Sequence, residues 1–198
     1  MDASDWDRRY AATELLWSAE PNRFVDAELA NLPPGPAVDL AAGEGRNAIW
    51  LASRGWQVSA VDFSAVAIAK GRTLAEAAGV EVEWVIADLL DHVPEPDRFD
   101  LVLVAYLQLP SEQLGTVLDR AARALAPGGV LLVVGHDVEN LRHGVGGPQD
   151  PAVLYSPEGI TARLPGPSVD RAERVRRPVV DADRAAIDIL VRAHRSAG

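Results

Sequence analysis

Residues 38–47 read VDLAAGEGRN, an apolar run that breaks into a turn holding two glycines, Gly43 and Gly45. A strand that ends in such a turn directly before a helix is typical of nucleotide sites, because glycine allows close backbone approach and the helix offers free N–H groups. The dinucleotide fingerprint has three glycines, and Ala41 and Ala48 stand where its first and third would be. A structural strand-to-helix turn would also explain the two glycines.

Outside this turn, the first two thirds of the chain alternate between strand-like and helix-like patterns. A helix from Ser111 has a one-faced apolar stripe and is expected to end at the Pro-Gly-Gly of 127–129. Ser64 is placed to cap another helix that runs to about Gly79. The alternation predicts right-handed crossovers and an open parallel sheet with helices on both faces. Strands are expected at 37–42, 56–64, 80–88, 99–107 and 130–137.

The last third of the chain has a different pattern. Residues 138–155 are rich in glycine and proline and predict a long loop, followed by a short helix near 157–164. Two strand-like runs then follow at 168–180 and 185–195, joined so closely that they must be antiparallel. We therefore predict one α/β domain over 1–198 with a Rossmann-like, seven-stranded, mostly parallel sheet. The first 30 residues are expected to form a helical cap beside it.

Composition limits the classes of function. The chain has 198 residues and no cysteine, so disulfides, thiol nucleophiles and thiolate metal sites are excluded. A net charge of −10 opposes binding of a phosphate backbone, so we expect a small-molecule partner and no nucleic acid. The basic cluster at 171–177 is interpreted as a solvated edge strand. No run is long and apolar enough to span a membrane, and a cytoplasmic location is expected. Nothing in the sequence specifies an oligomeric state.

Three aspartates are placed at the ends or interior of the first three expected strands. Asp62 lies roughly 20 residues beyond the turn, where an acid can accept hydrogen bonds from ribose hydroxyls. Asp88 is positioned for the edge of a base, and Asp39 inside the first strand could receive an ammonium group. A dinucleotide contains a pyrophosphate, which requires a third glycine that this turn lacks. The ligand that best fits the turn and the three aspartates is therefore a nucleoside joined to an amino acid. That description matches S-adenosylmethionine.

The turn DLAAGEG resembles the first motif of class I S-adenosylmethionine-dependent methyltransferases, with Ala41 replacing a glycine. The runs VDFS, AD at 87–88, FDLVLVAYL and LAPGGVLLVV are similar to the later motifs in order. WDRRY and GRNAIWLA resemble the tellurite-resistance and thiopurine methyltransferase branch. The resemblance implies the seven-stranded sheet and S-adenosylmethionine as cofactor. The Ala41 departure is expected to be mild, since alanine is tolerated where φ stays negative.

The resemblance also implies roles for individual residues. The turn would hold the methionine part of the cofactor, and Asp62 would bind the ribose hydroxyls. Phe63 would lie against the adenine ring, and Asp88 and the Leu89 amide would hydrogen-bond the edge of that ring. Ala105 and Tyr106 would lie beside the sulfonium. The implied cofactor-binding set is Asp39, Ala41, Gly43, Gly45, Arg46, Asn47, Asp62, Phe63, Ser64, Asp88, Leu89 and Ala105.

Residues that contact the methyl acceptor should lie on the same edge of the sheet. His136, at the end of the fifth strand, is the best candidate for a general base, although it could equally satisfy the strand end by hydrogen bonds. Tyr106 could orient an acceptor or merely pack. No metal is expected, because methyl transfer depends mainly on alignment and exclusion of water. Further candidates are Trp17, Gln108, Asp137, His143 and Tyr155.

Two segments are candidates to cover the site. The loop 138–155 suits an active-site lid with glycine hinges, and Tyr155 could close over the pocket; a plain connector is the alternative. Trp6, Tyr10 and Trp17 could cap the cofactor or only pack on the sheet.

The primary hypothesis is methyl transfer to a small acceptor such as a thiol, a selenium or tellurium species, or another heteroatom. A non-catalytic S-adenosylmethionine-binding regulatory domain is the alternative. A nicotinamide-dependent oxidoreductase is disfavoured by the missing third glycine.

Overall fold

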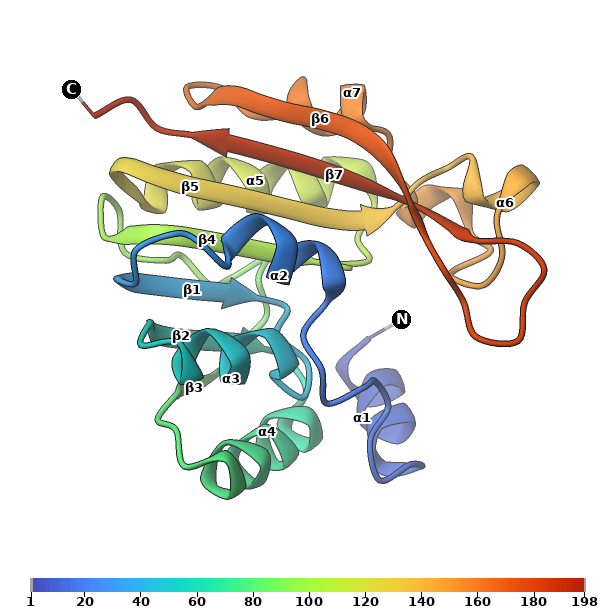
Figure 1. Cartoon of the computed structure of the whole chain (residues 1–198), viewed down its shortest axis with the longest axis horizontal. Helices are drawn as coiled ribbons and strands as arrows, with labels where there is room; N and C mark the ends of the chain where they lie inside the picture. Colours follow the sequence, from blue (N-terminus) through green and yellow to red (C-terminus); the bar gives the residue numbers. More distant parts are fainter. Residues whose placement is uncertain (1, 198) are drawn as a thin grey trace.

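The structure, a computed structural model, describes residues 2–197 and is organised around one seven-stranded sheet (Figure 1). The strand order is β3-β2-β1-β4-β5-β7-β6. The first five strands pair in parallel, whereas β7 pairs antiparallel with both β5 and β6. The predicted fold class is therefore confirmed. The strands are β1 Pro36–Leu40, β2 Gln57–Asp62, β3 Glu83–Ile86, β4 Phe99–Ala105, β5 Leu125–His136, β6 Ser168–Arg177 and β7 Ala186–His194.

Helices cover both faces of the sheet, because successive side chains of each strand point to opposite faces. Val38 and Leu40 of β1 pack into one buried core with α5, and Ala37 packs into the other with α2 and α3. The N-terminal helix α1 lies against α4, beside the sheet (Figure 1). The helices are α1 Ala3–Ala11, α2 Arg23–Leu29, α3 Arg46–Ser53, α4 Ala65–Ala78, α5 Ser111–Ala124, α6 Asn140–His143 and α7 Pro157–Thr161, with a 3₁₀ turn, η1, at Pro151–Val153. None of the helices within 2–197 is long and apolar enough to cross a membrane.

Strand order reverses between β1 and β4, and this reversal places the site. From β1 the chain proceeds outward to β2 and β3, then returns to pair β4 on the other side of β1. The connections on the two sides diverge at the carboxyl ends of β1 and β4, which leaves a crevice there. The glycine turn after β1 and Tyr106 after β4 both border this crevice.

Several expected boundaries differ from the structure, most clearly in three segments. Helix α5 ends at Ala124, before the Pro-Gly-Gly, because Leu125 is already extended and pairs with Phe99 of β4. The third strand is limited to Glu83–Ile86. The segment 138–155 is not a continuous loop, since it contains α6 and η1. A lid function for this segment stays a prediction.

The expectation for Ala41 is wrong. Its φ is +65°, in the left-handed region, and not negative. The β carbon of an L-residue crowds the following carbonyl in this region, which costs roughly 1–2 kcal/mol. The turn therefore requires the conformation that glycine adopts freely, and alanine adopts it under strain.

We expect Ala41→Gly to stabilise the protein by about 0.5–1 kcal/mol, because relief of the left-handed strain exceeds the extra entropy of the unfolded glycine. The same exchange at Ala48, buried inside α3, should destabilise the protein by at least about 1 kcal/mol. Urea unfolding of both variants measures the difference. A destabilised Ala41→Gly variant would contradict the strain at this turn.

Candidate active site

A cavity of about 600 Å³ lies at the carboxyl ends of the strands. Its walls come from the glycine turn, the ends of β2 to β5, the N-terminal segment and the end of β6. Most predicted site residues line it, although they are spread over much of the sequence. Those lining it are Trp17, Ala41, Gly43, Arg46, Asn47, Asp62, Phe63, Asp88, Leu89, Ala105, Tyr106, Gln108 and His136.

The turn and the end of β2 are joined through Asp62. One carboxylate oxygen accepts from the Gly43 amide at 2.8 Å, and the other accepts from the Ser64 amide at 2.9 Å. Burial raises the pKa of Asp62, while these amides act in the opposite direction. The carboxylate is thus fixed at the cavity wall, and each oxygen keeps a lone pair that can accept from a ribose hydroxyl.

Two residues of the predicted cofactor set have structural roles. A β carbon at Gly45 would lie 2.2 Å from the Trp84 ring, so packing against β3 requires this glycine. Gly45 does not line the cavity. The Ser64 hydroxyl caps α4 at the Ala67 amide and donates to Asp7. Both residues therefore support the walls of the cavity and do not line it.

Asp39 is buried beneath the turn with 0% exposure, and neither carboxylate oxygen has a hydrogen-bond partner among the described residues. Burial, and secondarily the charge of Asp62, raises the pKa of Asp39 to about 7. A buried carboxylate without a partner is costly unless a ligand compensates it. An ammonium group, reached directly or through water, would supply that compensation.

Arg46 offers the opposite charge on the cavity side of the turn. It is partly buried, and within the described residues its guanidinium has no carboxylate in ion-pair range, only the Ser18 hydroxyl at 3.4 Å. Burial lowers the pKa of Arg46, and Asp39 is among the groups that raise it. An anion and a cation that each lack a close partner suit the two charged ends of an amino acid. The residues present therefore fit the methionine part of S-adenosylmethionine.

The segment 12–22 covers part of the cavity because Glu44 of the turn binds it. The buried Glu44 carboxylate accepts from the Leu16 amide at 2.9 Å and the Trp17 amide at 3.4 Å. Lys70 of α4 pairs with Glu44 at 3.2 Å and also donates to the backbone of this region. Trp17 remains 41% exposed at the rim. Sequence reasoning missed Glu44 and Lys70, since both have the charge of ordinary surface residues.

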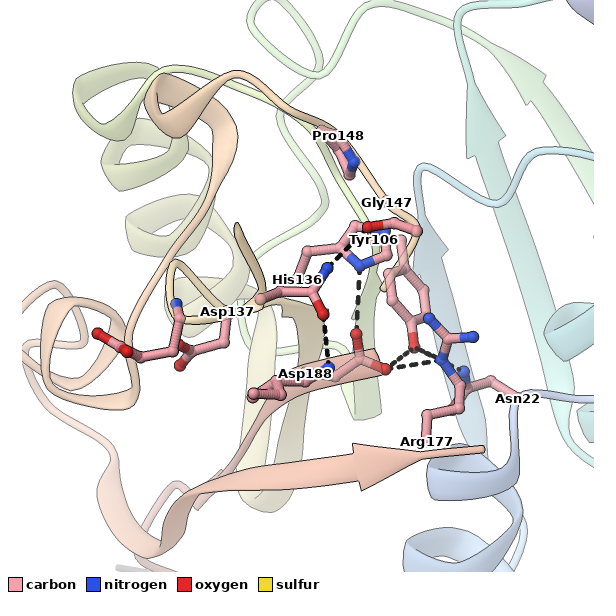
Figure 2. Close-up of polar contacts among 12 residues, drawn as sticks. Asn22, Tyr106, His136, Asp137, Gly147, Pro148, Arg177 and Asp188 are labelled. Carbon is pink, nitrogen blue, oxygen red and sulfur yellow. Dashed lines mark hydrogen bonds and ion pairs between the residues drawn. The ribbon is translucent and has the colours of Figure 1, made fainter. Parts of the chain in front are cut away.

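A polar cluster centred on Asp188 of β7 forms another part of the cavity wall (Figure 2). One carboxylate oxygen of Asp188 lies 3.2 Å from Nδ1 of His136. The other accepts from the Tyr106 hydroxyl at 2.7 Å and from Nε of Arg177 at 2.7 Å. Asn22 donates to the Tyr106 hydroxyl at 3.2 Å. All of these residues except Asp188 line the cavity.

The hydrogen bonds of this cluster assign proton positions. Burial acts to raise the pKa of Asp188, but hydrogen bonds from His136, Arg177 and Tyr106 outweigh it and lower the pKa. An ionised Asp188 accepts from Nδ1–H of His136, which leaves the Nε2 lone pair of the neutral ring available. The Tyr106 hydroxyl already donates to Asp188, and burial raises its pKa far above the usual range. His136 is therefore better suited than Tyr106 to accept a proton.

Three predicted acceptor or lid residues lie outside the cavity. Asp137 is buried and forms an ion pair with Arg174 at 3.0 Å. His143 is 65% exposed and lies beside Glu139. Tyr155 is buried, and its hydroxyl hydrogen-bonds the backbone of Leu107 and Leu109, so it supports the wall from behind and does not close over the pocket.

The basic cluster is not a uniformly solvated edge. Arg171 pairs with Glu28 and Glu173, Arg174 with Asp137, and Arg177 with Asp188. Sequence reasoning missed Arg177 and Asp188 as site residues. A lone aspartate inside the apolar run AAIDILV was the available signal, because such a residue needs a buried partner.

The strand order, the antiparallel end of the sheet and the position of the cavity define a Rossmann-like class I methyltransferase fold. A family model described as a methyltransferase domain matches residues 37–129. The match and the fold relate this chain to S-adenosylmethionine-dependent methyltransferases, and the residues of the cavity fit that cofactor.

Individual relatives agree with this assignment. The demethylmenaquinone methyltransferase of Thermus thermophilus is 38% identical over 124 residues, which are 61% of this chain and 54% of that protein. The chain spans about half the length or less of the curated relatives it matches. A solved structure from a study of the conversion of a disulfide bond into a thioacetal in echinomycin biosynthesis has a TM-score of 0.79 at 22% identity, covering 99% of this chain and 93% of that one. At that identity the likeness shows the fold.

Two expectations are not confirmed by the relatives. TehB from Haemophilus influenzae shares the fold, with a TM-score of 0.74 at 14% identity over 88% of this chain and 62% of that one, but this does not establish the tellurite-resistance branch. The tRNA 5-carboxymethoxyuridine methyltransferase of Escherichia coli is 33% identical over 64% of this chain and 49% of that protein. The exclusion of nucleic acid is therefore unsupported. A non-catalytic domain is not favoured, because the curated relatives are named as methyltransferases.

We expect Asp39→Asn to stabilise the ligand-free protein at pH 8 by about 1–3 kcal/mol, because it removes an uncompensated buried charge. In the parent protein the pKa of Asp39 is raised from 3.8 to about 7. The folded state thus keeps a proton that the unfolded chain loses, and the free energy of unfolding falls as pH rises through this window. Urea unfolding at pH 5 and pH 8 measures both effects.

The same substitution should weaken binding of S-adenosylhomocysteine at least tenfold, because the ammonium group loses its anionic partner. Asp100→Asn, at an exposed position of β4, is the matched control and should change neither quantity. Unchanged affinity in Asp39→Asn, measured by calorimetry, would remove Asp39 from the cofactor site.

Proposed function

We propose that this chain transfers a methyl group from S-adenosylmethionine to a heteroatom of a small acceptor, such as a thiol or a selenium or tellurium species. The supporting observation is the His136–Asp188 pair at the wall of a cavity that is also lined by the glycine turn, whose residues suit the cofactor. Because His136 lines the cavity and Asp188 lies behind it, the pair presents an unprotonated ring nitrogen toward the acceptor.

The cofactor would be held by residues already positioned by the fold. Asp39 and Arg46 would bind the ammonium and carboxylate groups, and Asp62 would bind the ribose hydroxyls. Phe63 and Asp88 would contact the adenine. These contacts are formed by strand ends and a helix start, so the cofactor would find most of its site preorganised.

When bound, the cofactor supplies a sulfonium methyl group: the acceptor heteroatom bonds the methyl carbon, the carbon–sulfur bond breaks, and sulfur keeps the electron pair. His136 takes up the proton that the acceptor loses, at Nε2, and Asp188 stabilises the resulting imidazolium. Tyr106 and Trp17 restrict water at the cavity walls. The net charge of −10 favours a small acceptor over a nucleic acid.

The proposal is tested by measuring S-adenosylhomocysteine release with a panel of thiols, chalcogen oxyanions, amines and phenols. Turnover of at least one class is expected, together with calorimetric binding of S-adenosylmethionine. Cofactor binding without turnover of any class would favour a regulatory domain. Absence of both heat and thermal shift at millimolar cofactor would overturn the proposal altogether.

With a turned-over acceptor, we expect His136→Asn to lower kcat by about 10²–10⁴-fold, because proton uptake is lost. Cofactor affinity should change little, since the His136 ring pairs with Asp188 and not with a residue of the glycine turn. His143→Asn, at an exposed site outside the cavity, is the matched control and should retain the parent rate. A parent-like kcat in His136→Asn would show that no base is needed there.

A further inference from the structure

Arg177, the last residue of β6, uses only one side of its guanidinium within the protein. Nε donates to Asp188 at 2.7 Å and lies 3.2 Å from the Tyr106 hydroxyl. Its central carbon is 5.7 Å from the centre of the Tyr106 ring. Among residues 2–197, the two terminal nitrogens have no hydrogen-bond partner. Arg177 is 29% exposed and lines the cavity, and Figure 2 shows these nitrogens directed away from Asp188.

A guanidinium held in this way is prepared to bind a carboxylate. Its two terminal nitrogens form a planar fork that matches the two oxygens of a carboxylate. Since Asp188 and Tyr106 already fix Nε, little side-chain freedom remains to be lost on binding. A lysine would have the charge without this geometry.

The position of Arg177 relates such an anion to the methyl-transfer chemistry. Arg177 and His136 bind the two different oxygens of the same Asp188 carboxylate. They therefore lie within the length of one small molecule. A ligand with its carboxylate on Arg177 can place an atom a few bonds away beside His136.

The other charged groups around the cavity favour an anion over a cation at this end. Asp188 is compensated by Arg177, and Glu44 is compensated by Lys70. Asp62 accepts from two backbone amides, those of Gly43 and Ser64, and Asp88 accepts from the Leu90 amide. Arg46 adds a second cation to the cavity lining. None of the three carboxylates among the described lining residues, Glu44, Asp62 and Asp88, forms a hydrogen bond or ion pair with His136, Tyr106 or Arg177.

We infer that the acceptor is a small carboxylic acid, bound through its carboxylate by Arg177, with a thiol or hydroxyl group as the methylated atom. This inference rests on the proposed function for the identity of the reaction. The recognition of a carboxylate by Arg177 rests on the geometry of the cluster.

The test compares binding of acids with that of their neutral amides to protein saturated with S-adenosylhomocysteine. The probes are mercaptobenzoate and hydroxybenzoate isomers, each paired with its primary amide and titrated by calorimetry. We expect each bound acid to bind at least tenfold more tightly than its amide. In Arg177→Gln the preference should disappear, while affinity for S-adenosylhomocysteine stays the same.

Two further variants separate recognition from folding. Arg174→Gln removes an arginine of the same strand that pairs with Asp137 outside the cavity, and it should keep the full acid preference. Arg177→Lys should keep the charge and part of the preference. Thermal unfolding shows whether each variant is folded. Equal binding of acid and amide by the parent protein would overturn the inference. So would the absence of binding by every probe at about 10 mM, or an acid preference that persists in Arg177→Gln.

The same titrations on cofactor-free protein distinguish this inference from the proposed function. If the protein binds acids more tightly than amides but does not bind S-adenosylhomocysteine, the anion site at Arg177 stands and the proposed methyl transfer is overturned. Binding of S-adenosylhomocysteine without an acid preference would overturn the anion site alone.

Discussion

The parallel pairing of β1 with β4 is the constraint on which the site depends. Residues 37–40 align with 101–104, although about 60 residues of chain, carrying two strands and two helices, separate them. Because the crossovers leave the two strands in opposite directions, their carboxyl ends border one crevice that no connection fills. The glycine turn, Tyr106 and His136 lie at its edge. If this pairing moved by one residue, every side chain of the strand would change face and the cavity would lose its walls.

Two carboxylates buried behind the wall of this crevice have opposite electrostatic environments. Asp188 receives three hydrogen-bonding partners from different elements, which hold it ionised despite full burial. Asp39 has none within the described residues, and burial raises its pKa to about 7. A satisfied network rigidifies a site, whereas an unsatisfied group is costly until a ligand arrives. The Asp188 cluster is therefore organised in advance, whereas Asp39 lacks a partner until a ligand supplies one.

The cavity is also closed by local sequence that does not belong to the sheet. Glu44, between the two glycines of the turn, binds the backbone of residues 16 and 17 and pairs with Lys70 of α4. The turn thus has two functions, since its backbone borders the cavity and the Glu44 side chain holds the N-terminal segment across it. A β carbon at Gly43 would lie 2.7 Å from the Tyr10 hydroxyl, which shows how closely that segment approaches.

The sequence by itself determined the alternation of strands and helices, the terminal antiparallel pair, the glycine turn, and the places of Asp62, Asp88 and His136. These features follow from local periodicity and from the rule that parallel strands end at a common edge. Only the tertiary structure decided that Ala41 is left-handed, that Gly45 accommodates Trp84, that Tyr155 supports the wall, and that Arg177 and Asp188 belong to the site. Each depends on a side chain from a distant segment, and the pairing of β7 with β5 and β6 is what brings Asp188 to His136 and Arg177. Hydrophobic patterning specifies which face a residue occupies, but not which polar groups meet there.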